Sequence, residues 1–190
     1  MTFASPKTSD PAAPQSPKKI NPVWIICLLL AYTAAAQFAV GSSIERLATE
    51  NTEHNQFSSQ EVLVTFLRVG VIIWSALASF LQGLVLRPIY KGIVKGRGPT
   101  LGASWFWVLL GQIPFMATVL VMGLFLEPGA QGLLGQGWVR ILFGTIAGAI
   151  YIAAAKTVFA APNGRLAILF VIVATVNSVL LVSGSSALNT

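Results

Sequence analysis

Residues 62–86 read VLVTFLRVGVIIWSALASFLQGLVL, and this stretch decides the fold class. Its only charged residue is Arg68. A helix of about 20 mainly apolar residues crosses the hydrocarbon core of a bilayer. The stretch is therefore long enough to form a membrane-spanning helix with some tilt.

Similar apolar runs occur along the whole chain, and we expect five spans: residues 23–41, 62–86, 104–126, 139–156 and 166–183. Of 190 residues, 55% are hydrophobic and only 9% are charged, whereas a soluble domain carries about 25% charged residues. A surface so poor in charge must face lipid. The sequence therefore predicts an all-α integral membrane protein, a five-helix transmembrane bundle that forms one domain over residues 21–186.

The N-terminal segment, residues 1–20, has four prolines and no hydrophobic periodicity, which predicts a disordered cytoplasmic tail. The first apolar run, which follows it, has a competing interpretation as a signal peptide. Lys18 and Lys19 form a basic flank, and residues 34–36 offer a small-residue cleavage site. The run continues to Val40, past that site, which favours an uncleaved span.

The distribution of basic residues predicts the orientation. With the N-terminus inside, the inner segments hold nine of the twelve Lys and Arg residues: Lys7, Lys18, Lys19, Arg87, Lys91, Lys95, Arg97, Lys156 and Arg165. This excess on one side follows the positive-inside rule and predicts a cytoplasmic N-terminus and an external C-terminus. It also explains the net charge of +6, so we expect no nucleic-acid partner. The two shortest runs, the fourth and fifth, could instead form a tight hairpin.

Six residues within the expected spans are candidate functional residues: Arg68, Gln37, Gln82, Gln112, Pro114 and Asn177. An amide side chain cannot face lipid without losing its hydrogen bonds. The amides therefore either join helices to one another or line a polar pathway or ligand site. Pro114 predicts a kink in the third span.

Arg68 has two interpretations. Near the outer interface its long side chain can extend toward water, and Glu61, two helical turns earlier on the same face, could pair with it. Alternatively, Arg68 faces the bundle interior and holds an anionic ligand, an anionic lipid headgroup or a carboxylate of a partner protein.

Two other segments carry weaker signals. Lys91, Lys95 and Arg97 either set the orientation or capture anionic lipid headgroups, and the spacing of residues 89–95 fits a short interfacial helix. Gly144 and Gly148 form a G-x-x-x-G pattern, which serves either packing within the bundle or dimerisation. The polar residues 42–61 form the longest connection outside the membrane.

The search for chemistry is otherwise negative. The single histidine, His54, lies among Glu50 and Glu53 in what we interpret as a solvated acidic loop. Cys27, the single cysteine, lies inside an apolar run and is interpreted as a small lipid-facing or packed residue. We therefore predict no catalytic residue, no cofactor and no metal site. The spans contain no Asp or Glu, which weighs against an ion-coupled carrier.

One family resemblance is carried by two segments, residues 95–100 (KGRGPT) and 111–114 (GQIP). A Gly/Lys-containing segment followed by a helix with a small-polar-Pro pattern resembles the Yip1-like integral membrane proteins, over roughly residues 22–185. The resemblance implies a cytoplasmic tail and five spans. It carries over no catalytic residue, and its eukaryotic relatives are linked to vesicle traffic.

These observations favour a non-enzymatic scaffold, an assembly or trafficking-type partner within the membrane. The alternative is a small transporter or channel, or a transporter subunit. An enzyme acting on lipids has only the basic segment in its favour. The expected partners are the lipid bilayer, anionic lipid headgroups, and another protein or a second copy of the chain. We expect the bacterial cytoplasmic membrane as the location.

Overall fold

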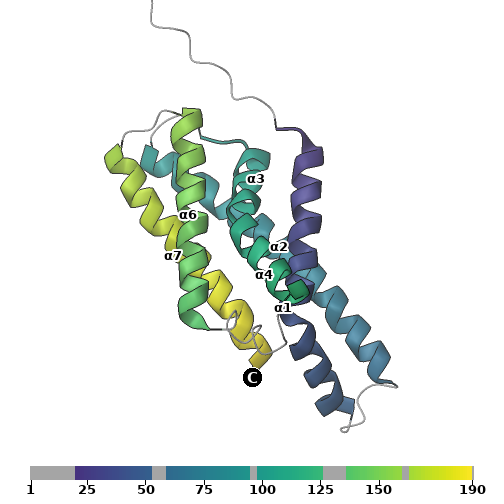
Figure 1. The fold of residues 1–190 in the computed structure, drawn as a ribbon. Coiled ribbons are helices and arrows are strands. Elements are labelled where there is room, and N and C mark those ends of the chain that lie inside the picture. Colours follow the sequence, from purple (N-terminus) through teal and green to yellow (C-terminus); the bar gives the residue numbers. More distant parts are fainter. Residues whose placement is uncertain (1–19, 53–58, 95–97, 126–135, 160–162, 190) are drawn as a thin grey trace, which may run out of the picture.

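The computed structural model describes residues 20–52, 59–94, 98–125, 136–159 and 163–189, and their regular structure is entirely helical (Figure 1). The helices are α1 (Pro22–Thr52), α2 (Gln60–Val94), α3 (Leu101–Gly111), α4 (Ile113–Phe125), α6 (Gly137–Phe159) and α7 (Asn163–Asn189). Five helical segments are long and apolar enough to cross a membrane, with α3 and α4 together forming one of them. The five-helix bundle predicted from the sequence is thus confirmed.

The side chains are distributed as lipid requires. Large apolar residues such as Trp74, Phe125 and Val171 are more than 60% exposed, whereas Ser104, Gln112 and Asn177 are buried. A water-soluble domain rarely exposes so much contiguous apolar surface. The chain is a multi-pass α-helical membrane protein.

The bundle interior contains two apolar clusters. The first joins α2, α3, α6 and α7 through residues such as Leu86, Val108, Tyr151 and Val173. The second joins α1, α4 and α6 through residues that include Ala35, Met116 and Val139. The first cluster is nearer the end of the bundle where α2 ends and α7 begins, which we call the basic end. There Arg165 Nη1 donates a hydrogen bond to the Val94 carbonyl at 2.9 Å.

Helices α1 and α2 both extend beyond the spans expected from the sequence. Most of residues 42–61, expected as a loop, is helical, because α1 continues to Thr52 and α2 begins at Gln60. The segment from Ile44 to Ala48 consists of good helix formers and contains no Gly or Pro. Figure 1 shows this pair of helix ends projecting beyond α4 and α6, at lower right. We call residues 42–52 and 59–68 the projection.

The other end of α2 also differs from expectation. The basic segment was expected as a loop with a separate short helix, but α2 runs through Pro88 to Val94 without interruption. Proline within a helix removes one backbone hydrogen bond. Tyr90, fully buried in the same apolar cluster as Leu86, holds the last turns of the helix against the bundle.

The third span is broken at Gln112, two residues before the expected kink at Pro114. The α3 helix ends at Gly111, and the Gln112 N–H bonds to the Leu109 carbonyl at 3.1 Å. Because Pro114 has no N–H, it cannot donate to the Leu110 carbonyl, so the regular ladder stops. The α4 helix then begins at Ile113.

Helices α6 and α7 form the most extensive helix pair, and each is long enough to cross the membrane. Gly144 and Gly148 lie in their interface. A Cβ atom on Gly144 would lie 2.7 Å from the Ser178 backbone nitrogen, and one on Gly148 would lie 3.1 Å from the Ala174 Cα. The G-x-x-x-G pattern therefore serves packing within the chain, and dimerisation through it would require this interface to open.

Candidate functional site

Three of the four candidate amides are buried in the centre of the bundle. The exposed fractions are 6% for Gln82 on α2, 4% for Gln112 at the α3–α4 break, and 4% for Asn177 on α7. The fourth, Gln37, is only partly buried, and its Nε2 donates to the Arg68 carbonyl of α2 at 2.7 Å. Gln37 therefore joins two helices, whereas the other three amides lie deeper.

Each of these buried amides has a polar atom without a hydrogen-bond partner among the described residues. The atoms are Gln82 Nε2, Gln112 Oε1 and Asn177 Oδ1. Burying an amide without a partner is unfavourable, and the cost is greatest where no water can reach. Most buried polar atoms in native proteins are paired, so these three amides are unusual. Arg87 Nε is a further buried atom without a hydrogen-bond partner among the described residues.

A second polar group lies nearby and is paired. Ser104 Oγ donates to the Gly83 carbonyl at 2.9 Å and lies 3.3 Å from the Tyr151 hydroxyl. Trp105 Nε1 donates to Ser79 Oγ at 3.2 Å. These bonds connect α2, α3 and α6, and a Cβ on Gly83 would lie only 3.0 Å from the Trp105 Cα. They act as interhelical links of the kind expected in lipid.

Sequence reasoning did not single out these serines. For Ser79 the signal is spacing, because Ser75, Ser79 and Gln82 recur at helical intervals on one face of α2, and all three are buried. This pattern does not extend to Ser104 on α3.

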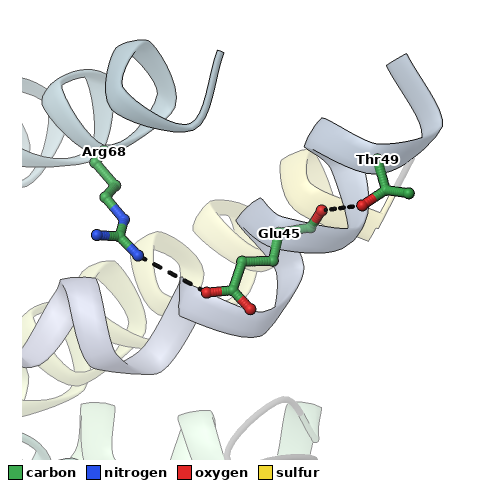
Figure 2. Close-up of polar contacts among 3 residues, drawn as sticks. All are labelled: Glu45, Thr49 and Arg68. Atoms are coloured by element: carbon green, nitrogen blue, oxygen red, sulfur yellow. Dashed lines mark hydrogen bonds and ion pairs between the residues drawn. The ribbon is translucent and has the colours of Figure 1, made fainter. Parts of the chain in front are cut away.

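Arg68 lies on the projection and outside the bundle core. Its Nη2 is 3.8 Å from Glu45 Oε1, and the two side chains are 53% and 67% exposed (Figure 2). The partner of Arg68 is Glu45, and not Glu61 as suggested from the sequence. Glu45 reaches Arg68 because α1 continues alongside α2. One turn later in α1, the Thr49 hydroxyl donates to the Glu45 backbone carbonyl at 2.9 Å. The Arg68 guanidinium therefore lies on the exposed surface of α1 and α2 and not in the bundle interior.

The ion pair borders an open depression of about 620 Å³. Its lining comes from both helices of the projection: Glu45, Ser59, Gln60, Glu61, Val64, Thr65 and Arg68. Gln60 Nε2 also donates to the Thr49 hydroxyl at 3.1 Å, which ties the start of α2 to α1. Two carboxylates and one guanidinium give this surface a net negative charge.

The remaining candidates lie at the basic end or outside the described residues. Lys91 is exposed on the last turn of α2, while Lys95 and Arg97 fall outside the described ranges, as do His54 and the tail up to residue 19. No group of three or more His, Cys, Asp or Glu side chains able to hold a metal occurs among the described residues. Cys27 is exposed on the apolar part of α1.

Comparison with protein-family models, with curated proteins and with solved structures finds no match to this chain.

Proposed function

We propose that the chain is a non-enzymatic membrane scaffold, an assembly or trafficking-type partner, and that the projection of α1 and α2 receives a basic segment of another protein. The observation that carries the proposal is the negatively charged depression between these helices. Glu45 lies beyond Gly41, where the apolar part of α1 ends. Its carboxylate can therefore meet a partner in water.

The Arg68–Glu45 pair supports this role because it links α1 and α2 at the edge of the depression and fixes where the two charges lie. An exposed ion pair adds little stability, so its value lies in positioning charge. With Glu45 already paired, Glu61 is the carboxylate best placed for a lysine or arginine of the partner. The resemblance to Yip1-like proteins is what suggests the trafficking-type version of the role.

Crosslinking tests the proposal. A photoreactive residue replaces Thr65, which lines the depression, and in a matched control it replaces Ile73, which is 61% exposed on the apolar part of α2. We expect a specific protein adduct from position 65 that Glu61→Lys abolishes and Glu61→Asp retains. An adduct pattern identical to that of position 73, or one unchanged by Glu61→Lys, would contradict the proposal.

The orientation is part of the same proposal. The positive-inside rule places the projection outside the cytoplasm, in our proposal on the outer face of a bacterial cytoplasmic membrane. A reporter fused after Thr190 should be external and one inserted at Thr100 cytoplasmic. A cytoplasmic C-terminus would require another number of crossings.

A further inference from the structure

The last two turns of α2 carry two cations at the basic end of the bundle. Arg87 and Lys91 are four residues apart, so they are neighbours on the surface of the helix. The same turns are packed against the bundle through Tyr90, which is fully buried, and through the partly buried Ile93. Lys91 is exposed and Arg87 is partly buried. The end of α2 is thus held against the bundle, with Lys91 on its exposed side.

Arg165, in the first turn of α7, brings a third cation to this place. Figure 1 shows the start of α7 beside the end of α2, at upper left. The Arg165 Nη1 donates to the Val94 carbonyl, one of the last carbonyls of α2, which have no partner within their own helix. Val94 is three residues from Lys91 and therefore its neighbour on the helix surface. The bond uses one of five N–H donors and holds the exposed guanidinium beside the turn that carries Lys91.

Gly98 positions the Lys91 side chain. A Cβ atom on Gly98 would lie 2.5 Å from Lys91 Cγ and 3.1 Å from Lys91 Cε. The aliphatic part of Lys91 therefore lies against the Gly98 backbone, where a larger residue would displace it. Gly92, which directly follows Lys91, has nothing within 4 Å of the same position. The glycine at position 98, and not the one at 92, decides where Lys91 lies.

The described part of the chain supplies no carboxylate at this end. Its acidic residues, Glu45, Glu50 and Glu61, all lie on the projection, at the opposite end of α2. Arg87 Nε is buried and has no hydrogen-bond partner among the described residues. Leaving a buried donor of a charged group unpaired is costly. The surface formed by Arg87, Lys91 and Arg165 therefore lacks both a counter-charge and an acceptor.

The level of this surface in the membrane indicates what supplies them. The membrane-crossing parts of α3 and α7 begin at Leu101 and Asn163, and that of α6 ends at Thr157. The basic end is therefore at the boundary between hydrocarbon and headgroups. Phosphate oxygens accept strong hydrogen bonds from Arg and Lys, and basic residues at this level attract anionic lipids. The exposed apolar Leu84, one turn deeper on α2 than Pro88, offers a surface to an acyl chain.

We propose that Arg87, Lys91 and Arg165 form a binding surface for the headgroups of anionic phospholipids in the leaflet at the basic end. Lys91 and Arg165 contact the phosphates from the exposed side. Arg87, one turn nearer the hydrocarbon core than Lys91, contributes the donor that has no acceptor among the described residues. This surface is separate from the projection, and neither proposal depends on the other.

Native mass spectrometry of the full chain in detergent tests the proposal. The chain is titrated with dioleoylphosphatidylglycerol, with dioleoylphosphatidylcholine, which has the same acyl chains and a zwitterionic headgroup, and with inorganic phosphate. We expect phosphatidylglycerol to bind at least about fivefold more tightly than phosphatidylcholine, the factor equivalent to about 1 kcal/mol for one basic residue. Equal affinity for the two lipids would overturn the proposal, as would binding of inorganic phosphate with no preference between the lipids.

A charge variant locates the surface. Lys91→Gln should lower the affinity for phosphatidylglycerol about fivefold and leave that for phosphatidylcholine unchanged. The matched control is Arg46→Gln, which removes an exposed cation from the projection and should leave both affinities unchanged. An equal loss in the two variants would show that net charge, and not this surface, attracts the lipid, and would overturn the proposal.

A second pair of variants leaves every charge in place. Gly98→Ala should displace Lys91 and lower the affinity for phosphatidylglycerol toward that of Lys91→Gln. Gly92→Ala should leave it unchanged, because a Cβ there meets nothing within 4 Å. The same affinity in Gly98→Ala and Gly92→Ala would overturn the role assigned to Gly98 in positioning Lys91.

Discussion

Arg68 and Gln112 both interrupt apolar runs, yet their surroundings are opposite. Arg68 is 53% exposed and pairs with Glu45 across the α1–α2 projection. Gln112 is 4% exposed at the centre of the bundle and has an unpaired oxygen. A polar residue near the end of a long helix can reach water, whereas one in mid-membrane must be satisfied from inside. The position of a polar residue along its helix, and not its polarity alone, therefore decides whether it needs a hydrogen-bond partner inside the protein.

The largest expected contrast between the two regions comes from glycine substitutions. Gly144→Leu should destabilise the protein by about 3 kcal/mol, because its Cβ would lie 2.7 Å from the Ser178 backbone nitrogen. Gly70→Leu, near Arg68, should change stability by no more than about 1 kcal/mol, because a Cβ there meets nothing within 4 Å. Thermal unfolding in detergent and membrane accumulation measure both. An equal loss of stability in Gly144→Leu and Gly70→Leu would contradict the contrast between the buried and exposed regions.

Hydrogen-bonded serines should show a smaller contrast. Ser104→Ala removes the bond to the Gly83 carbonyl and the contact with the Tyr151 hydroxyl, and should cost about 1–2 kcal/mol. The control is Thr145→Val, since the exposed Thr145 hydroxyl bonds to the Ile141 carbonyl of its own helix. Its loss should cost less than about 0.5 kcal/mol. Denaturant titration of the two variants measures the difference, and a neutral Ser104→Ala would argue against a linking role.

Substitution of Arg68 should affect stability still less. Arg68→Leu should change it by less than about 1 kcal/mol, because the Glu45 pair is exposed. The protein should accumulate normally while the adduct from position 65 weakens. Arg68→Lys separates charge from geometry: if Lys fails as badly as Leu, a contact specific to guanidinium is involved. Normal accumulation and an unchanged adduct in Arg68→Leu would end the functional interpretation of this residue.

Deletion of residues 2–17 should have the smallest effect. This segment offers little apolar surface to bury, so membrane insertion and thermal unfolding should be unchanged. A shortened chain that fails to accumulate would show that the tail packs against the bundle, and the comparison between exposed and buried regions would then have to include it.

Much of the fold follows from hydropathy, because the interior of a bilayer imposes one requirement on every span. The five apolar runs and the interruption caused by Pro114 were predictable for that reason. The extensions of α1 and α2 were not. Residues 42–52 are mostly polar, and hydropathy does not report that Ile44 and Ala48 within them are buried.

The sequence by itself determined that Gln82, Gln112 and Asn177 would avoid lipid, since an amide keeps its hydrogen bonds only inside the bundle. Only the tertiary structure decided which atoms of these amides lack a partner among the described residues, and that Arg68 meets Glu45 instead of Glu61. Both depend on how helices distant in the chain are aligned along their axes. That alignment is set by close contacts such as Gly111 against Ala147 and Gly144 against Ser178, which arise from side-chain shape and not from polarity.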